Sequence, residues 1–295
     1  MKTLTSKVTK AQFKKIDSMY KSFKQKDLKN ENLLAFYKTK DLAISVFKNG
    51  TLLLQGDDSA ILNFGKQTTS SSTKKVLSKN IDGTIGMDEV GTGDYFGPVV
   101  TCACYVPNIS LDKVKALKVN DSKKIDDRHI RVMAKQLKKI VLSETCICQP
   151  VVYNKIINQF DNSNMVKAIC HNDSLTKLTN KIKNQHYKVI LDQFVARNNY
   201  YNYLKQAKIK PAYIDIIEMK AESKYISVAC ASVIARDAFL TQMDKLSAKA
   251  GVKLPRGAVE KDKIISVGKQ IIKKAKLAEF AKLHFDSITG EILKK

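Results

Sequence analysis

From about residue 83 to the end of the chain, short β-branched apolar runs alternate with longer stretches in which apolar residues recur every three to four positions. The short runs predict strands at 84–87, 99–106, 141–152, 187–191 and 213–217. The longer stretches predict helices at 121–140, 163–182 and 225–246, with more helix to about residue 283. Strands that alternate with helices predict an α/β fold, in which helices flank a mixed sheet.

The N-terminal part has a different pattern, which predicts a small α+β unit. A helical period covers about residues 11–23. Two strand-like runs, 41–47 and 51–55, flank Asn49-Gly50, a dipeptide that favours a tight hairpin turn. A second short helix is expected over 60–64, after polar residues that can cap it.

A polar segment follows this unit. Residues 67–80 are rich in serine and threonine and have no apolar period, which is typical of a linker. We therefore expect an N-terminal domain at 1–66, a linker at 67–80 and a larger domain at 81–295. The first 80 residues hold 16 Lys, no Arg and 6 acidic residues, a balance of 16 − 6 = +10.

The whole chain is strongly basic. Its 52 Lys and Arg residues against 28 Asp and Glu leave a formal charge of +24 over 295 residues. Such an excess favours polyanionic partners, nucleic acid first and an anionic membrane surface second. Lysine-rich usage can also follow from an AT-rich genome, so the charge alone does not decide the partner.

The apolar patterning gives no sign of a membrane protein. The longest clear apolar run is about eight residues, near 99–106, whereas a membrane span needs roughly 18. Residues 1–15 carry charge without the apolar core of a signal peptide. We expect a soluble, cytoplasmic protein with no membrane partner.

The cysteines are interpreted as reduced core thiols rather than as a zinc site. They form two C-x-C pairs in strand-like segments, and no C-x-x-C pair occurs. The six residues are Cys102, Cys104, Cys146, Cys148, Cys170 and Cys230.

Candidate chemistry lies in acidic residues at the ends of predicted strands. Asp88 and Glu89 follow the apolar segment 85–87 and precede a glycine-rich turn. Asp192 follows a short core strand, which is a common ligand position in α/β sheets. Glu222 lies just before the predicted helix that begins near residue 225. Each acid alone could be a cap or a turn residue.

Grouped carboxylates repel one another and raise each other's pKa unless cations neutralise them. Hard oxygen ligands select Mg²⁺ or Mn²⁺, and two such ions roughly 3.5–4 Å apart suit in-line attack on a phosphodiester. One ion would generate the attacking hydroxide and the other would stabilise the leaving 3′ oxygen, so no histidine base is needed. Neighbours in a regular strand point to opposite faces, so Asp88 and Glu89 can share a site only if the strand ends or bulges there.

The segment 86–98, GMDEVGTGDYFGP, closely resembles the first motif of the type 2 ribonucleases H, and its GTGDYFGP form is similar to that of ribonuclease HIII. Further segments resemble that family's later motifs, in the family's order and over about residues 83–290. They are DSKK at 121–124, LDQF at 191–194, KAES at 220–223, SVACASVIAR at 227–236, LPRGA at 254–258 and AKLHF at 281–285.

The resemblance implies roles for individual residues. The family's four catalytic, metal-binding acids correspond to Asp88, Glu89, Asp192 and Glu222. Asp88 would bridge both ions. The substrate-binding residues would be Gly91, Thr92, Gly93, Lys123 and Arg236. The three loop residues would lie along the RNA strand near ribose 2′-hydroxyls, which distinguish RNA from DNA. Lys123 and Arg236 are weaker candidates for phosphate contact, and an exposed helix charge explains Arg236 equally well.

The resemblance also implies a ribonuclease H-like catalytic domain and an N-terminal domain similar to the TATA-binding protein fold, which would grip the substrate. The stretch 37–56 is the most similar part of that domain. His284 is expected to be a structural histidine rather than part of the site.

The expected activity is endonucleolytic hydrolysis of the RNA strand of an RNA–DNA hybrid, by a two-metal-ion mechanism that leaves 5′-phosphate and 3′-hydroxyl ends. The hybrid is the expected partner of a monomer, with no protein partner implied. Two alternatives stay open, a ribonuclease HII-type activity on single embedded ribonucleotides and a non-catalytic hybrid-binding protein. A nucleotide phosphotransferase would favour a G-x-x-x-x-G-K-[ST] loop, which the sequence does not contain.

Overall fold

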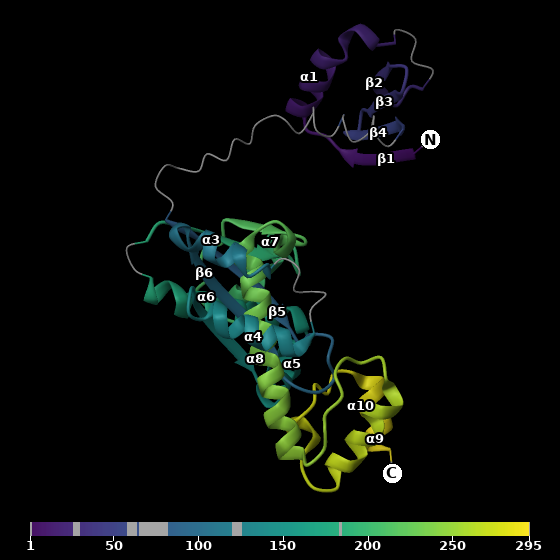
Figure 1. The fold of residues 1–295 in the computed structure, drawn as a ribbon. Coiled ribbons are helices and arrows are strands. Elements are labelled where there is room, and N and C mark those ends of the chain that lie inside the picture. The colour runs from purple at the N-terminus through teal and green to yellow at the C-terminus, as the bar shows by residue number, and fades with distance from the viewer. Residues whose placement is uncertain are drawn as a thin grey trace. The chain divides into compact units, whose positions relative to one another are not determined.

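The computed structural model describes residues 2–25, 30–57, 64, 82–119, 126–182 and 185–294. The chain divides into two units, Met1–Lys79 and Asn80–Lys295, each with its own core (Figure 1). The expected linker at 67–80 lies outside the described residues.

In its described residues, the first unit has a four-stranded antiparallel sheet and the helix α1. Its strand order is β1-β4-β3-β2. The elements are β1 (Lys2–Lys7), α1 (Lys10–Met19), the 3-10 turn η1 (Lys21–Phe23), β2 (Leu33–Lys38), β3 (Leu42–Phe47) and β4 (Thr51–Gly56). The predicted helix and hairpin are confirmed, and Gly50 takes the positive φ, +78°, that the turn requires.

Two strands of this unit are missing from the sequence prediction. β1 is a polar edge strand whose Leu4 is half exposed, so it shows no apolar alternation. In β2 the apolar run hides the alternation, because Ala35 and Tyr37 are buried while Leu34 is exposed. The second predicted helix lies outside the described residues except for Phe64, which is buried in this core.

The second unit is built on a five-stranded sheet of order β7-β6-β5-β8-β9. Strands β5, β6 and β7 pair antiparallel, whereas β8 and β9 run parallel to β5. The strands are β5 (Gly83–Val90), β6 (Val99–Pro107), β7 (Leu142–Cys148), β8 (Tyr187–Asp192) and β9 (Ile216–Glu218). This is the predicted mixed sheet.

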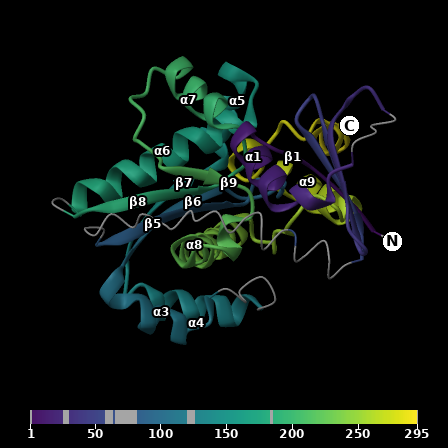
Figure 2. The ribbon, with the colours of Figure 1, turned by 90° about the horizontal axis from the view of Figure 1, so that it is seen from above.

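Helices cover both faces of this sheet. In Figure 2, α6 and α7 lie on one face, and α8 lies on the other with α3 and α4 outside it. The helices are α3 (Leu111–Ala116), α4 (Asp127–Leu137), α5 (Pro150–Phe160), α6 (Ser163–Lys181), α7 (Arg197–Gln206), α8 (Ile226–Ala250), α9 (Lys261–Ile272) and α10 (Asp286–Leu293), with 3-10 turns η2 (Asn108–Ser110), η4 (Ala221–Ser223) and η5 (Leu277–Glu279).

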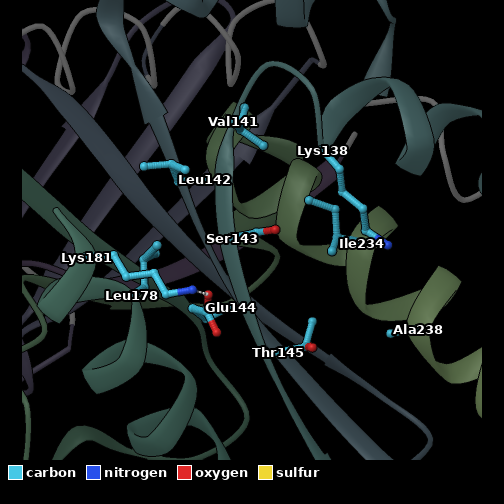
Figure 3. Close-up of a pocket in the computed structure, with 10 residues that line it drawn as sticks. All are labelled: Lys138, Val141, Leu142, Ser143, Glu144, Thr145, Leu178, Lys181, Ile234 and Ala238. Carbon is cyan, nitrogen blue, oxygen red and sulfur yellow. Dashed lines mark hydrogen bonds and ion pairs between the residues drawn. The ribbon is translucent and has the colours of Figure 1, made fainter.

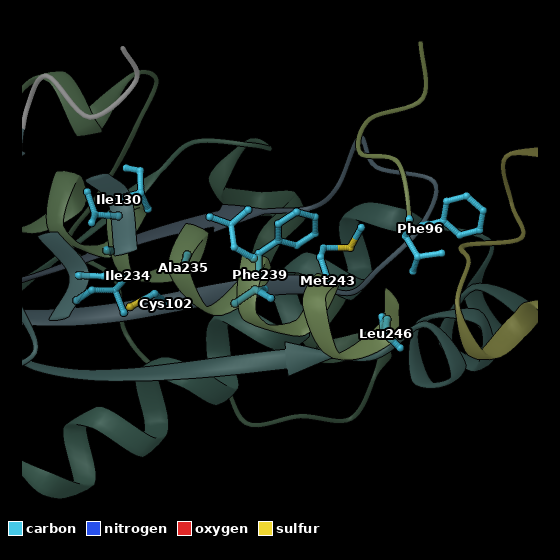
Figure 4. Close-up of a cluster of buried hydrophobic side chains, with 14 of the residues drawn as sticks. Phe96, Cys102, Ile130, Ile234, Ala235, Phe239, Met243 and Leu246 are labelled. Carbon is cyan, nitrogen blue, oxygen red and sulfur yellow. The ribbon is translucent and has the colours of Figure 1, made fainter. Parts of the chain in front are cut away.

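Helix α8 forms the centre of the larger core. Its first turn touches β5 backbone to backbone, because a Cβ on Gly86 would overlap the main chain of Ser227. Its buried side chains Ile234, Phe239 and Met243 follow one another along the helix in one cluster with Cys102 of β6, which lies beside Ile234 (Figure 4). By length and composition α8 could cross a membrane, but its apolar window is 61% buried inside the protein, as in a core helix.

Three sequence expectations need correction. The helix expected from residue 121 begins at Asp127, because Asp126 is its N-cap and accepts the His129 N–H at 2.9 Å. The strand expected to reach residue 152 ends at Cys148, because Pro150 starts α5 at a position where its missing N–H costs nothing. The strand expected at 213–217 is shorter and shifted, as β9. Helices α3, α5, α7 and α10 were not predicted.

Candidate active site

Asp88 and Asp192 lie side by side on neighbouring parallel strands. Strands β5 and β8 pair in register up to Met87 and Leu191, so the next residue of each strand is an aspartate. Adjacent strands are roughly 4.8 Å apart, and residues at the same register point to the same face. The structure therefore brings these two predicted residues together at one end of the sheet.

Asp88 faces α8 and is almost fully buried, with 9% of its surface exposed. It lies opposite Cys102 of β6, bonds Ser232 of α8, and accepts the Glu89 N–H at 2.7 Å. Burial first, and then the charges of Glu89 and Asp192, raise the pKa of Asp88 to about 8. A carboxyl group in this position needs a nearby cation to be fully ionised at neutral pH.

Glu222 is placed at the same end of the sheet through Asp192. The Ala221 N–H donates to Asp192 Oδ1 at 2.8 Å, and Ala221 packs against Ile190 and Val228. Lys220, directly before the turn η4, takes a left-handed conformation with φ of +56°, a strained backbone for a residue with a side chain. These contacts fix the turn that carries Glu222.

Glu89 points to the opposite face of the sheet. Strand β5 pairs regularly with β6 through Val90, so it neither ends nor bulges at Asp88, and the condition under which both acids would share one face is not met. On the α6 face the Glu89 carboxylate contacts His171 Nε2 at 2.9 Å and Lys167 Nζ at 3.8 Å. Burial lowers the pKa of Lys167, against the opposing pull of Glu89. Glu89 still influences Asp88 electrostatically, although it does not share its face.

The donor set suits a hard divalent cation. Carboxylate oxygens are the ligands that Mg²⁺ and Mn²⁺ prefer. The hydrogen bonds from Ser232 and the Glu89 N–H do not offset the burial of the Asp88 carboxyl, so a cation would stabilise its anion further. In the part of the chain that the structure describes, no three acidic, histidine or cysteine side chains already converge as a complete set of metal ligands. Asp88 and Asp192 are therefore the core of the candidate centre, and Glu222 and Glu89 flank it.

The glycine-rich loop beside Asp88 depends on two of its glycines. Gly91 and Gly97 have φ of +90° and +88°, a region that other residues rarely adopt. A Cβ on Gly91 would overlap the Pro98 carbonyl, and one on Gly97 would overlap the Met243 sulfur. Thr92 and Gly93, at the loop tip, are exposed. The loop can therefore approach a ligand closely with its backbone.

The same loop is anchored by two residues that the sequence reasoning missed. Asp94 Oδ1 accepts the Gly257 N–H at 2.6 Å. Lys282 is fully buried and donates to the Gly97 carbonyl at 2.7 Å. Burial lowers the pKa of Lys282 to about 7, with Asp94 and Cys148 opposing it. A lysine inside an apolar segment, AKLHF, was the available sequence signal for this buried cation.

Arg236 is held by an ion pair. Its Nη2 lies 2.9 Å from Asp127 Oδ1, and Arg256 binds the other oxygen of the same carboxylate. This arrangement favours a structural role for Arg236 over phosphate contact. Lys123, the other candidate for phosphate contact, lies outside the described residues.

Two histidines differ in how well they were predicted. His284 lies 3.4 Å from the Tyr153 hydroxyl, beside Phe285, and has the packing expected of a structural histidine. His171 was not among the candidate residues from the sequence, but its contact with Glu89 makes it part of the site's surroundings. The spacing of Lys167 and His171, four residues apart, was the one signal that both share a helix face.

A separate cavity lies beside the edge strand β7. It has a volume of about 350 Å³ and is lined by Lys138, Glu144 and Lys181 among others (Figure 3). Lys181 is paired with Glu144, and Lys138 with Asp237. None of the four candidate acids lines it, so this cavity is distinct from the acidic site.

Comparisons with known proteins agree with this site. Residues 85–288 match the family model of ribonuclease HII. The chain is similar to a ribonuclease HIII of Phytoplasma mali (strain AT), with 38% identity over 293 residues and 96% of each chain covered. It is also similar to a ribonuclease HIII of Bacillus cereus, with 36% identity over 264 residues, 84% of this chain and 85% of that protein.

Solved structures give the same picture. Bst-RNase HIII in complex with Mn²⁺ superimposes with a TM-score of 0.68 at 30% identity, covering 99% of this chain and 98% of that one. RNase H3 of Aquifex aeolicus has a TM-score of 0.57 at 23% identity, with 96% of this chain and 100% of that one covered, and it supports the fold alone.

Proposed function

We propose, from the premise that this chain belongs to the ribonuclease HII family and to its ribonuclease HIII group, that its active centre is formed by Asp88, Glu89, Asp192 and Glu222. The chain is an endoribonuclease H with a ribonuclease H-like fold, which hydrolyses the RNA strand of RNA–DNA hybrids with divalent metal. The ends left would be a 5′-phosphate and a 3′-hydroxyl. A cytoplasmic, monomeric enzyme is part of the same proposal.

The observation that carries the proposal is the buried Asp88 beside Asp192. Two aspartates at the same register on neighbouring parallel strands give a compact pair of oxygen donors. Burial makes the Asp88 anion costly without a cation. The pair therefore supports cation binding at the end of the sheet next to the exposed glycine-rich loop.

In this centre the protein's residues hold and orient the reacting groups. Asp88 and Asp192 would hold the cations, and Glu222 and Glu89 would complete the set. The chemistry that Mg²⁺ or Mn²⁺ supplies when bound is activation of water for in-line attack and stabilisation of charge on the leaving 3′ oxygen. The Ala221 N–H fixes the Asp192 carboxylate, and Ser232 fixes that of Asp88.

The loop of Gly91, Thr92 and Gly93 would select RNA. Its backbone is held in place by the required glycine conformation and by the Lys282 contact with Gly97. Exposed backbone groups at the tip can bond ribose 2′-hydroxyls, which a DNA strand lacks. Lys123 stays a proposed phosphate contact, and Arg236 has little support beyond its charge.

The N-terminal unit would grip the hybrid. Its lysine-rich composition favours phosphate contact, and its sheet with a covering helix is compatible with a fold similar to the TATA-binding protein. Deleting residues 1–80 should weaken hybrid binding and flatten its salt dependence, while cleavage chemistry persists. Equal binding by the truncated protein at every salt concentration would rule out the gripping role.

The test of the function uses two labelled duplexes in Mg²⁺ and in Mn²⁺, a full RNA–DNA hybrid and a DNA duplex with one ribonucleotide. The wild-type chain should cut the hybrid alone, and Asp88→Asn should cut neither. Asp112→Asn, which alters an exposed aspartate of α3, is the matched control and should keep full activity. Incision at the single ribonucleotide would assign the ribonuclease HII-type activity, and binding without cleavage would leave a hybrid-binding protein.

A further inference from the structure

Glu89 is contacted by two side chains of α6, His171 and Lys167, which together with Phe194 form a group called the Glu89 clamp. Its two carboxylate oxygens face different groups, with His171 Nε2 2.9 Å from Oε2 and Lys167 Nζ 3.8 Å from Oε1. Lys167 and His171 are four residues apart, so they project from one face of the helix. Because successive side chains of a strand point to opposite faces, Glu89 lies on the face away from Asp88 and contacts this pair of side chains.

The hydrogen bond from His171 has a defined direction. The ring is fully buried, and among the described residues its Nδ1 has no hydrogen-bonding partner. A proton on Nδ1 would be a buried donor without an acceptor, which costs about 1–3 kcal/mol. A proton on Nε2 is instead accepted by Glu89. The imidazole therefore donates from Nε2 and fixes one carboxylate oxygen.

Phe194, the third clamp residue, lies just after the strand that carries Asp192 and contacts the other two. Its ring stacks on His171 with centroids 5.5 Å apart and an angle of 14° between the planes. Lys167 Nζ lies 4.4 Å from the centre of the same ring. Phe194 follows Asp192 by two residues, so one aromatic side chain supports both residues that contact Glu89.

We propose that His171 is a positioning residue for Glu89, and that Lys167 and Phe194 complete the clamp. In this arrangement α6 fixes the orientation of the Glu89 carboxylate, which lies on the opposite face of β5 from Asp88. The inference rests on the proposed function, because it assumes that Glu89 contributes to cation binding. Removing a hydrogen-bond partner of a metal-binding carboxylate typically weakens metal affinity or activity by about 10- to 100-fold.

The experiment measures Mn²⁺ binding to the full-length protein by isothermal titration calorimetry. His171→Ala should bind Mn²⁺ at least about 10-fold more weakly than the wild type. His171→Gln, whose amide can donate to Glu89, should recover most of that loss. Ser174→Ala is the matched control, because Ser174 is buried on the same helix and does not contact Glu89, and it should bind Mn²⁺ as the wild type does.

A double-mutant cycle separates positioning from a general loss of structure. In a Glu89→Gln background, His171→Ala should weaken Mn²⁺ binding by less than about 2-fold, because the group that His171 positions is gone. The same fold-loss in both backgrounds, or no loss in either, would overturn the proposal. If thermal melting shows that His171→Ala does not fold, Lys167→Met goes through the same cycle, with the same expected coupling and the same overturning results.

Cleavage of the RNA–DNA hybrid by the wild type keeps the two proposals apart. A wild-type chain that binds Mn²⁺ and leaves the hybrid uncut would overturn the proposed function, whatever the cycle shows. A wild-type chain that cuts the hybrid, with His171→Ala unchanged in Mn²⁺ affinity, would overturn the clamp alone.

Discussion

Asp88 and Glu89 are neighbours on β5, yet the two faces of the sheet give their carboxylates opposite surroundings. On the α8 face, near the close backbone contact at Gly86, Asp88 is buried and bonded to Ser232, and burial raises its pKa to about 8. On the α6 face, Glu89 has a histidine and a lysine within reach. Strand β5 therefore carries a buried carboxyl group, Asp88, directly before a carboxylate that a histidine and a lysine contact, Glu89.

Because of this difference, Asp88 should affect the stability of the metal-free protein as well as its activity. An acid whose folded pKa lies above its unfolded value of about 4 binds more protons in the native state, so stability falls as the pH rises from about 4 to 8. Asp88 should thus destabilise the metal-free protein at neutral pH, and a bound cation should remove that penalty.

The largest effect is expected for Asp88→Asn. Hybrid cleavage should fall by on the order of 10³-fold or more, because cation binding supplies several kcal/mol of transition-state stabilisation. In EDTA the same variant should melt above the wild type, by roughly 4–8 °C at pH 8 for a gain on the order of 2 kcal/mol. Scanning calorimetry should show this gap closing toward pH 5. A variant less stable than the wild type at pH 8 would contradict the comparison.

Glu89→Gln should lose activity without the stability gain. Cleavage is expected to fall by on the order of 10²-fold, since a carboxylate is lost from the centre. The melting temperature in EDTA should stay the same or drop, because Lys167 and His171 lose their charged partner. If Glu89→Gln were stabilised as much as Asp88→Asn, the two faces would not differ as described.

The close packing of the α8 face can be tested at Gly86. Gly86→Ala places a methyl group against the main chain of Ser227, which cannot move without shifting α8, so a loss of about 2–4 kcal/mol is expected. Urea unfolding measures this. Gly93→Ala is the matched control, since open space surrounds that position, and it should change stability by less than about 0.5 kcal/mol.

The polar contacts of the α6 face should have a smaller effect. Thr101 is paired with Glu89 across the strands, and its hydroxyl donates to Ser174 of α6 at 3.3 Å. Thr101→Val keeps the shape and loses this bond, so we expect a loss of about 1 kcal/mol in the same urea experiment. A loss as large as that of Gly86→Ala would mean that both faces depend equally on tight packing.

The smallest effect is expected for Arg236→Gln, which breaks an ion pair with Asp127 away from both acids. Asp127 keeps Arg256 as a partner, so cleavage should change by less than about 3-fold. A much larger loss, restored by Arg236→Lys, would instead support the phosphate contact.

The sequence predicted the parts of this molecule that depend on local pattern. Alternating strands and helices, the carboxylates near the ends of β5 and β8, and the glycine loop could all be read from the order of residues. Resemblance to the type 2 ribonucleases H then joined acids more than 130 residues apart in the chain, Asp88 and Glu222. Without that resemblance, the sequence places acids at the ends of predicted strands but does not show that these ends meet.

The remainder depended on contacts between distant segments. Nothing in the sequence around His171 indicates Glu89, because their contact joins residues 82 positions apart and depends on the register of β5 with β6. Lys282 was hidden for a similar reason, since its acceptor is the carbonyl of Gly97. The polar edge strand β1 was missed because pairing with β4, and not its own pattern, makes it a strand.

The most direct test of the central claim is anomalous diffraction at the manganese edge from crystals of the protein soaked in Mn²⁺. The account predicts a peak about 2.0–2.2 Å from carboxylate oxygens of both Asp88 and Asp192, a typical distance for such oxygen ligands. Asp88→Asn crystals treated in the same way should lose that peak. A wild-type map with manganese elsewhere, and none between these two aspartates, would contradict the account.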